Sequence, residues 1–139
     1  MNIFLHYQKK IFTSLKKLGK KRVIIMPNKF KNLTVELPPK NELAAISCNA
    51  ALTLAKYNKI SSIDLAEILK KHLLSSFREF EDIKVAGPGF LNIYFSKSFW
   101  KKYLLKVIQL NTKYGSSKIN KKKYNIEFVS ANPTGLLHV

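Results

Sequence analysis

The sequence contains few of the residues on which several classes of protein depend. Cys48 is the single cysteine, which excludes an intrachain disulfide and a cysteine-rich zinc site and points to a reducing compartment. The histidines are isolated in the sequence, so we expect no metal site. No apolar run approaches the roughly 20 residues of a transmembrane helix, and we expect no membrane span.

Acidic residues are also scarce, since 8 Asp and Glu stand against 25 Lys and Arg for a formal net charge of +17. The excess favours an anionic partner, most simply a phosphate backbone. A solvated lysine-rich surface is an equal alternative, because only Arg22 and Arg78 can offer a guanidinium fork. The acid-free first 35 residues resemble a transit peptide or a membrane-surface helix, but they contain almost no arginine.

The spacing of apolar residues predicts most of the secondary structure. Three- and four-residue steps predict a helix over 3–18, an alanine-rich segment predicts one over 43–57, and Ser62 can cap a third that extends to about residue 80. A fourth helix is expected from Ser96 or Ser98 to 108. Runs of β-branched and aromatic residues predict strands over 23–26, 33–37, 83–86 and 90–95.

These elements predict an α+β fold, an antiparallel sheet with helices packed mainly on one face. Residues 1–110 would form this domain, and 111–123 would form a basic linker rich in Gly, Ser and Lys. A new strand over 124–129 would then begin a second, truncated domain over 124–139.

The strand predicted over 90–95 follows Gly87-Pro-Gly89, which indicates a tight antiparallel connection. Side chains alternate along a strand, so Phe90, Asn92 and Tyr94 share one face. An aromatic–amide–aromatic row can stack on an unpaired base and hydrogen-bond with it. The same row also fits an ordinary half-buried sheet, and composition alone favours that interpretation.

The end of the sequence, Glu127-Phe-Val-Ser-Ala-Asn-Pro-Thr-Gly-Leu-Leu-His-Val139, closely resembles the class I signature of bacterial arginyl-tRNA synthetases. That family continues with Gly-His to complete the "HIGH" element. Segments 46–56 and 85–95 resemble two stretches of the family's N-terminal domain. Ala44 and Ala45 depart from the usual Gly-Asp, and Leu136 departs from a usual Pro. The resemblance implies an N-terminal portion of the enzyme that stops inside the signature.

The resemblance further implies a parent enzyme that joins arginine to its tRNA through an arginyl-adenylate, using ATP and Mg²⁺. His138 would be catalytic by stabilising the triphosphate, and Glu127, Ser130 and Asn132 would face the arginine. The parent is expected to be cytoplasmic and monomeric, and the fragment is expected to be inactive and to bind no cofactor by itself. The residues assigned to the ATP and HIGH element are Ala131, Asn132, Pro133, Thr134, Gly135, Leu136, Leu137, His138 and Val139.

The family's N-terminal domain resembles an RNA-binding attachment that contacts the D-loop at the tRNA elbow. By this resemblance, Phe90 and Asn92, with Gly87 beside them, would contact the tRNA. The alternatives are a free-standing basic RNA-binding module with no enzymatic parent and, less well supported, a membrane-surface protein that uses the first helix.

Overall fold

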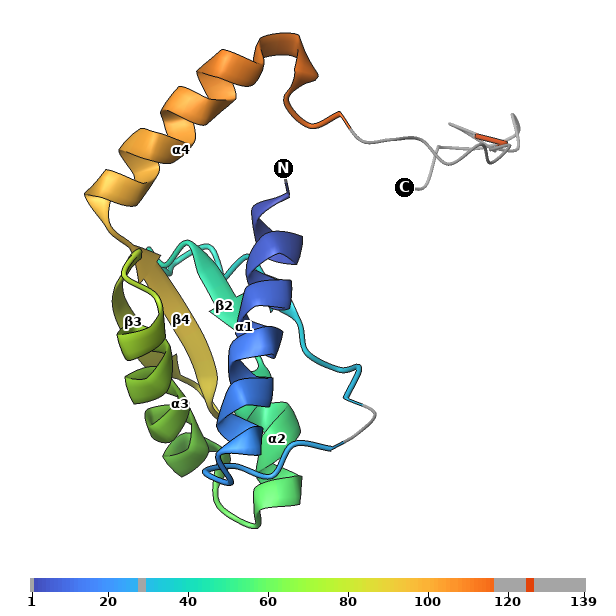
Figure 1. Ribbon diagram of the computed structural model, residues 1–139, viewed down its shortest axis with the longest axis vertical. Helices are drawn as coiled ribbons and strands as arrows, with labels where there is room; N and C mark the ends of the chain where they lie inside the picture. Colours follow the sequence, from blue (N-terminus) through green and yellow to red (C-terminus); the bar gives the residue numbers. More distant parts are fainter. Residues whose placement is uncertain (1, 28–29, 117–124, 127–139) are drawn as a thin grey trace, which may run out of the picture.

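The computed structural model describes residues 2–27, 30–116 and 125–126. Four strands form one antiparallel sheet in the order β1-β2-β4-β3 (Figure 1). The strands are β1 (Val35–Glu36), β2 (Ile46–Cys48), β3 (Phe80–Ala86) and β4 (Phe90–Phe95). The helices are α1 (Ile3–Lys20), α2 (Ala50–Asn58), α3 (Ser62–Ser76) and α4 (Lys97–Leu110), and a short 3-10 turn, Asn111–Lys113, follows α4.

The core lies between the sheet and helices α1, α2 and α3. Ile83, Leu91 and Ile93 are fully buried from the sheet side. Burial of one such side chain contributes about 1.5–3 kcal/mol. The helices contribute Ile11, Leu15, Leu54, Leu65, Leu69 and Leu73, which are also fully buried. The predicted α+β class, with helices mainly on one face of an antiparallel sheet, is therefore confirmed.

Helices α1 and α3 begin where side-chain oxygens satisfy their first N–H groups. The Oδ1 atom of Asn2 accepts hydrogen bonds from the N–H groups of Phe4 and Leu5, at 3.0 and 3.2 Å. Ser61, rather than the predicted Ser62, caps α3 by accepting from the N–H of Asp64. Such caps contribute about 1 kcal/mol each. Ser96 caps α4 as predicted, through the N–H of Phe99.

Helix α4 differs from the other three helices because it leaves the end of β4 and extends away from the sheet and its helices (Figure 1). None of its residues is buried, although the half-buried Phe99 in its first turn packs against the core. The compact part of the described structure therefore ends near the start of α4.

Two predictions about the first half of the chain are wrong. Residues 23–26 form no strand, because the side chain of Asn58 on α2 bonds both backbone groups of Ile25, at 2.7 and 3.1 Å, where a neighbouring strand would. Residues Ile46–Cys48 form the inner strand β2, and the predicted helix over 43–57 begins only at Ala50. A short, fully buried strand has no alternation of polar and apolar residues, so its pattern cannot be told from that of a buried helix.

The other boundaries shift less. The strand predicted over 33–37 contracts to Val35–Glu36, and the helix predicted to about 80 ends at Ser76, so that Phe80 begins β3. Of the strand predicted over 124–129 and the truncated second domain, the structure describes only residues 125–126, and most of the linker lies outside the described residues.

Candidate functional site

A row of polar side chains crosses the sheet on the face opposite the helices. In the strand register Glu36 pairs with Ser47, Ser47 with Asn92, and Asn92 with Lys84. Directly paired residues lie on the same side of a sheet. The alternate residues of β4, Leu91 and Ile93, point into the core, so this row must point away from it.

The row lines part of a hollow of about 640 Å³. The segment that follows β1 forms the opposite wall, and the β3–β4 turn forms one end. The lining residues are Glu36, Leu37, Pro38, Pro39, Asn41, Glu42, Ser47, Ala86, Gly87, Phe90 and Asn92. Two carboxylates and no lysine are among them, so the hollow does not attract a phosphate group directly.

Asn92 is the least usual residue of this lining. Its side chain is only 2% exposed, and its Oδ1 atom has no hydrogen-bond partner among the described residues. A buried polar atom without a partner costs about 1–3 kcal/mol. The Oδ1 atom itself has almost no exposed surface, so a ligand in the hollow could bond it only after a small movement of the side chains that cover it.

Aromatic rings flank Asn92 along β4. Phe90 is half-buried in the lining, and Tyr94 lies on the same face of the strand. The Tyr94 hydroxyl donates a long hydrogen bond, 3.5 Å, to Oε2 of Glu42, and the Lys84 ammonium lies 5.1 Å from the centre of the Tyr94 ring. These contacts involve a carboxylate of the lining, Glu42, and the cation at the β3 end of the row, Lys84.

The turn at the end of the hollow depends on two glycines with positive φ, Gly87 at 51° and Gly89 at 123°. A Cβ atom on Gly89 would lie 2.9 Å from the backbone oxygen of Ser62, whereas one on Gly87 would meet nothing within 4 Å. The Ser62 hydroxyl also donates a hydrogen bond to the carbonyl of Pro88. The first turn of α3 thereby fixes the turn and, with it, the start of β4 at Phe90.

The structure brings together the three residues that the sequence assigns to tRNA contact, Gly87, Phe90 and Asn92, in one hollow. The predicted catalytic residue His138, the arginine-facing residues Glu127, Ser130 and Asn132, and the whole 131–139 element lie outside the described residues. Sequence reasoning missed the opposite wall, Pro38 to Glu42, because these residues lie mostly between the strand predicted over 33–37 and the helix predicted over 43–57, where no site was expected. It also missed Ser47, because 46–48 was assigned to a helix.

The expectations of no metal site and no membrane span can be compared with the part of the chain that the structure describes. No group of three or more His, Cys, Asp or Glu side chains there could hold a metal ion. Over the same ranges, no helix is both long enough and apolar enough to cross a membrane.

The fold and the polar sheet face define a small α+β domain with a ligand-sized hollow. The model of the arginyl tRNA synthetase N-terminal domain family matches residues 5–95, which include every strand of the sheet and the complete hollow. The chain belongs to the arginyl-tRNA synthetase family.

Individual relatives agree with this assignment. The chain is 43% identical over 140 residues to the arginine–tRNA ligase of Pelagibacter ubique strain HTCC1062 and 36% identical to that of Wolbachia pipientis wMel, and both matches cover 100% of this chain and 24% of the relative. The arginine–tRNA ligase of Lawsonia intracellularis is 40% identical over 110 residues, 78% of this chain and 20% of the relative. The chain thus spans about a quarter of the length of the relatives it matches. Membership of this family favours the interpretation that the chain is part of a synthetase over the alternative of a free-standing basic RNA-binding module.

Proposed function

We propose that this chain is the tRNA-binding N-terminal portion of an enzyme that attaches arginine to its tRNA through an arginyl-adenylate, using ATP and Mg²⁺. The relatives that it matches over its full length are named arginine–tRNA ligases. The chain's own task in this proposal is to hold an unpaired base of the D-loop at the tRNA elbow. Arginine and ATP would bind mainly in the remaining three-quarters of the enzyme.

The observation that carries the binding role is the unpaired Oδ1 atom of Asn92 in the sheet-face hollow. An unpaired base has N–H groups on its Watson–Crick edge, and this covered oxygen would accept from one of them after a small movement of the side chains around it. The half-buried ring of Phe90 offers a surface for stacking, worth about 1–3 kcal/mol per base. Pro38 and Pro39 add an apolar wall opposite β4.

The charges around the hollow support a base rather than a phosphate as its occupant. Glu36 and Glu42 line it and repel an anion, yet each can accept a hydrogen bond from a base N–H. Lys84 pairs with Asn92 across the sheet and can attract the sugar-phosphate chain outside the hollow.

The binding role is tested by titrating the chain with an arginine-specific tRNA transcript and following fluorescence anisotropy. Phe90→Ala and Asn92→Ala should each weaken binding by roughly tenfold, the equivalent of about 1.4 kcal/mol. Phe12→Ala is the matched control, since Phe12 is a half-buried phenylalanine on α1 and does not line the hollow. It should leave the affinity within about twofold.

A second set of titrations identifies the bound group. A transcript with abasic D-loop positions should bind the parent chain about as weakly as the intact transcript binds Phe90→Ala, and the two changes together should add little. If both variants bind the intact transcript like the parent, the hollow does not hold a tRNA base and the proposal fails.

A further inference from the structure

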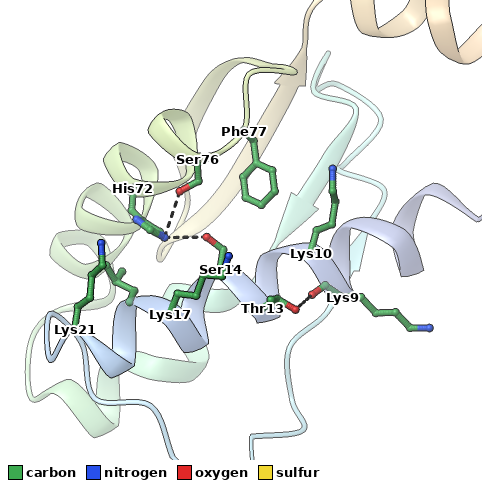
Figure 2. A pocket seen from close by; sticks show the side chains of 10 residues that line it. Lys9, Lys10, Thr13, Ser14, Lys17, Lys21, His72, Ser76 and Phe77 are labelled. Carbon is green, nitrogen blue, oxygen red and sulfur yellow. Dashed lines mark hydrogen bonds between the residues drawn. The ribbon is translucent and has the colours of Figure 1, made fainter.

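A second depression is lined by residues of α1 and α3, among the helices that cover the other face of the sheet (Figure 2). Its volume is about 570 Å³. We call it the α1–α3 groove and define it by its lining: Lys9, Lys10, Thr13, Ser14, Lys17, Leu18, Lys21, His72, Ser76 and Phe77. Four lysines and no carboxylate line it, which is the reverse of the sheet-face hollow.

Three of the four lysines are available to an anion. Lys10 is engaged, because its Nζ atom lies 2.8 Å from Oε1 of Glu79, the one ion pair among the described residues. Lys9, Lys17 and Lys21 are exposed and form no ion pair within the described ranges. The available charge of the groove is therefore strongly positive and uncompensated by any lining residue.

The available lysines form a line. Lys9, Thr13 and Lys17 follow one another at four-residue steps, which place side chains along one ridge of α1, and Lys21, the C-cap of the helix, comes four residues further on. With a rise of about 1.5 Å per residue, Lys9 and Lys17 are roughly 12 Å apart along the axis, and Lys17 and Lys21 roughly 6 Å apart. A line of cations of this length suits a polyanionic chain better than a single phosphate.

The floor of the groove supplies neutral hydrogen-bonding groups. The Ser14 hydroxyl of α1 lies 2.9 Å from Nε2 of His72 on α3, and the Ser76 hydroxyl lies 3.5 Å from the same nitrogen (Figure 2). Burial lowers the pKa of His72, a hydrogen bond with the Ser14 backbone acts in the opposite direction, and the charge of Lys21 lowers the pKa further. An anion in the groove would counter the effect of the lysines and raise this pKa.

We propose that the α1–α3 groove binds the phosphodiester backbone of an RNA strand, with Lys9, Lys17 and Lys21 on its phosphates and the hydroxyls of Ser14 and Ser76 as donors. This site is separate from the sheet-face hollow in place and in chemistry. The groove would contact several phosphates along an RNA strand, whereas the hollow suits a single base. The proposal does not depend on tRNA-elbow recognition.

The test is the binding of a single-stranded oligouridylate at several salt concentrations. Replacement of Lys9, Lys17 and Lys21 together by Gln should weaken binding by roughly tenfold or more and reduce the salt slope by about 2, since each lost phosphate contact removes about 0.7. The matched control replaces Lys97, Lys101 and Lys102, exposed lysines of α4, and removes the same charge. Equal losses in the two triple variants would show attraction by net charge alone and would overturn the proposal.

The pKa of His72 distinguishes binding in the groove from general attraction by net charge. The groups near it in the groove are Ser14 from α1, Lys21 just after α1 and Ser76 from its own helix, with no carboxylate among the lining residues. Saturation with oligouridylate should raise the pKa of His72 measured by NMR titration and leave that of His6, which does not line the groove, nearly unchanged. A His72 pKa that stays fixed at saturation contradicts the proposal.

Two further probes separate the sources of phosphate. Inorganic tripolyphosphate should compete only weakly with oligouridylate, because it cannot span the line of lysines. If tripolyphosphate or phosphatidylglycerol vesicles bind through these lysines while oligouridylate does not, the groove serves a different anion and the RNA assignment is wrong. The hollow is tested on the tRNA transcript through Phe90→Ala, and the groove is tested on oligouridylate through the lysine variant, so failure of the hollow and failure of the groove give different results.

Discussion

Asn92 on β4 lies directly opposite Ser47 on β2, yet the buried amide oxygen of Asn92 has no hydrogen-bond partner among the described residues. This unpaired oxygen, in the lining of the sheet-face hollow, therefore destabilises the folded state by about 1–3 kcal/mol. A cost of this kind is common at functional sites, where stability and binding compete.

Replacement of this amide should separate stability from binding. Asn92→Leu keeps a similar shape and removes the unpaired oxygen, so we expect the free energy of unfolding to rise by about 1 kcal/mol. The same change should weaken tRNA binding at least as much as Asn92→Ala, because neither side chain can accept a hydrogen bond. Urea unfolding and anisotropy titration measure the two effects. A lower urea midpoint for Asn92→Leu would mean that the amide stabilises the fold.

The two turn glycines should differ in their tolerance of a side chain. Gly89→Ala places a Cβ against the Ser62 carbonyl at a φ of 123°, so we expect a loss of about 2 kcal/mol or more. Gly87→Ala meets open space at a φ of 51° and should cost about 1 kcal/mol. Thermal unfolding of the two variants compares them directly. Equal losses would show that backbone strain alone, and not the contact with α3, determines the cost.

The carboxylate of Glu79 couples α1 to the start of β3. Lys10 Nζ lies 2.8 Å from its Oε1 atom, and the Tyr7 hydroxyl donates to the same oxygen at 3.2 Å. Burial alone raises the pKa of Glu79, but the hydrogen bonds and charge of its partners, chiefly Lys10, outweigh it, so this pKa lies below the ordinary 4.5. The pKa of Tyr7 is raised, first by burial and then by Glu79.

Because folding lowers the pKa of Glu79, acid should reduce the contribution of this carboxylate to the free energy of unfolding. The stabilisation is present above the unfolded-state pKa near 4.5 and is lost as the pH falls through the folded-state value. At neutral pH, Glu79→Gln should cost about 0.5–1 kcal/mol, since the pair is partly exposed. Urea midpoints measured from neutral pH down to about pH 3 should show the parent and variant converging in acid. A constant difference over this range would mean that the charge of Glu79 does not contribute.

The sequence was most informative where a pattern is long. The apolar stripe of α1 and the two β-rich runs around Gly87-Pro-Gly89 predicted elements that the structure confirms, and they placed Phe90 and Asn92 on one strand face. It failed at Ile46–Cys48, where three buried residues offer too short a run to separate strand from helix. The opposite wall of the hollow depends on contacts distant in sequence, such as Tyr94 with Glu42, and local patterns do not specify them.

The buried thiol of Cys48 should report unfolding of the central sheet. Cys48 is fully buried in β2, between β1 and β4, and burial raises its pKa to about 12. Because the thiolate is the reactive form, the folded chain should react with Ellman's reagent far more slowly than the unfolded chain, even in mildly alkaline buffer. The reaction rate should rise with urea along the same curve as far-ultraviolet circular dichroism. Reaction that precedes loss of secondary structure would show that β1, the two-residue edge strand, opens before the rest of the sheet.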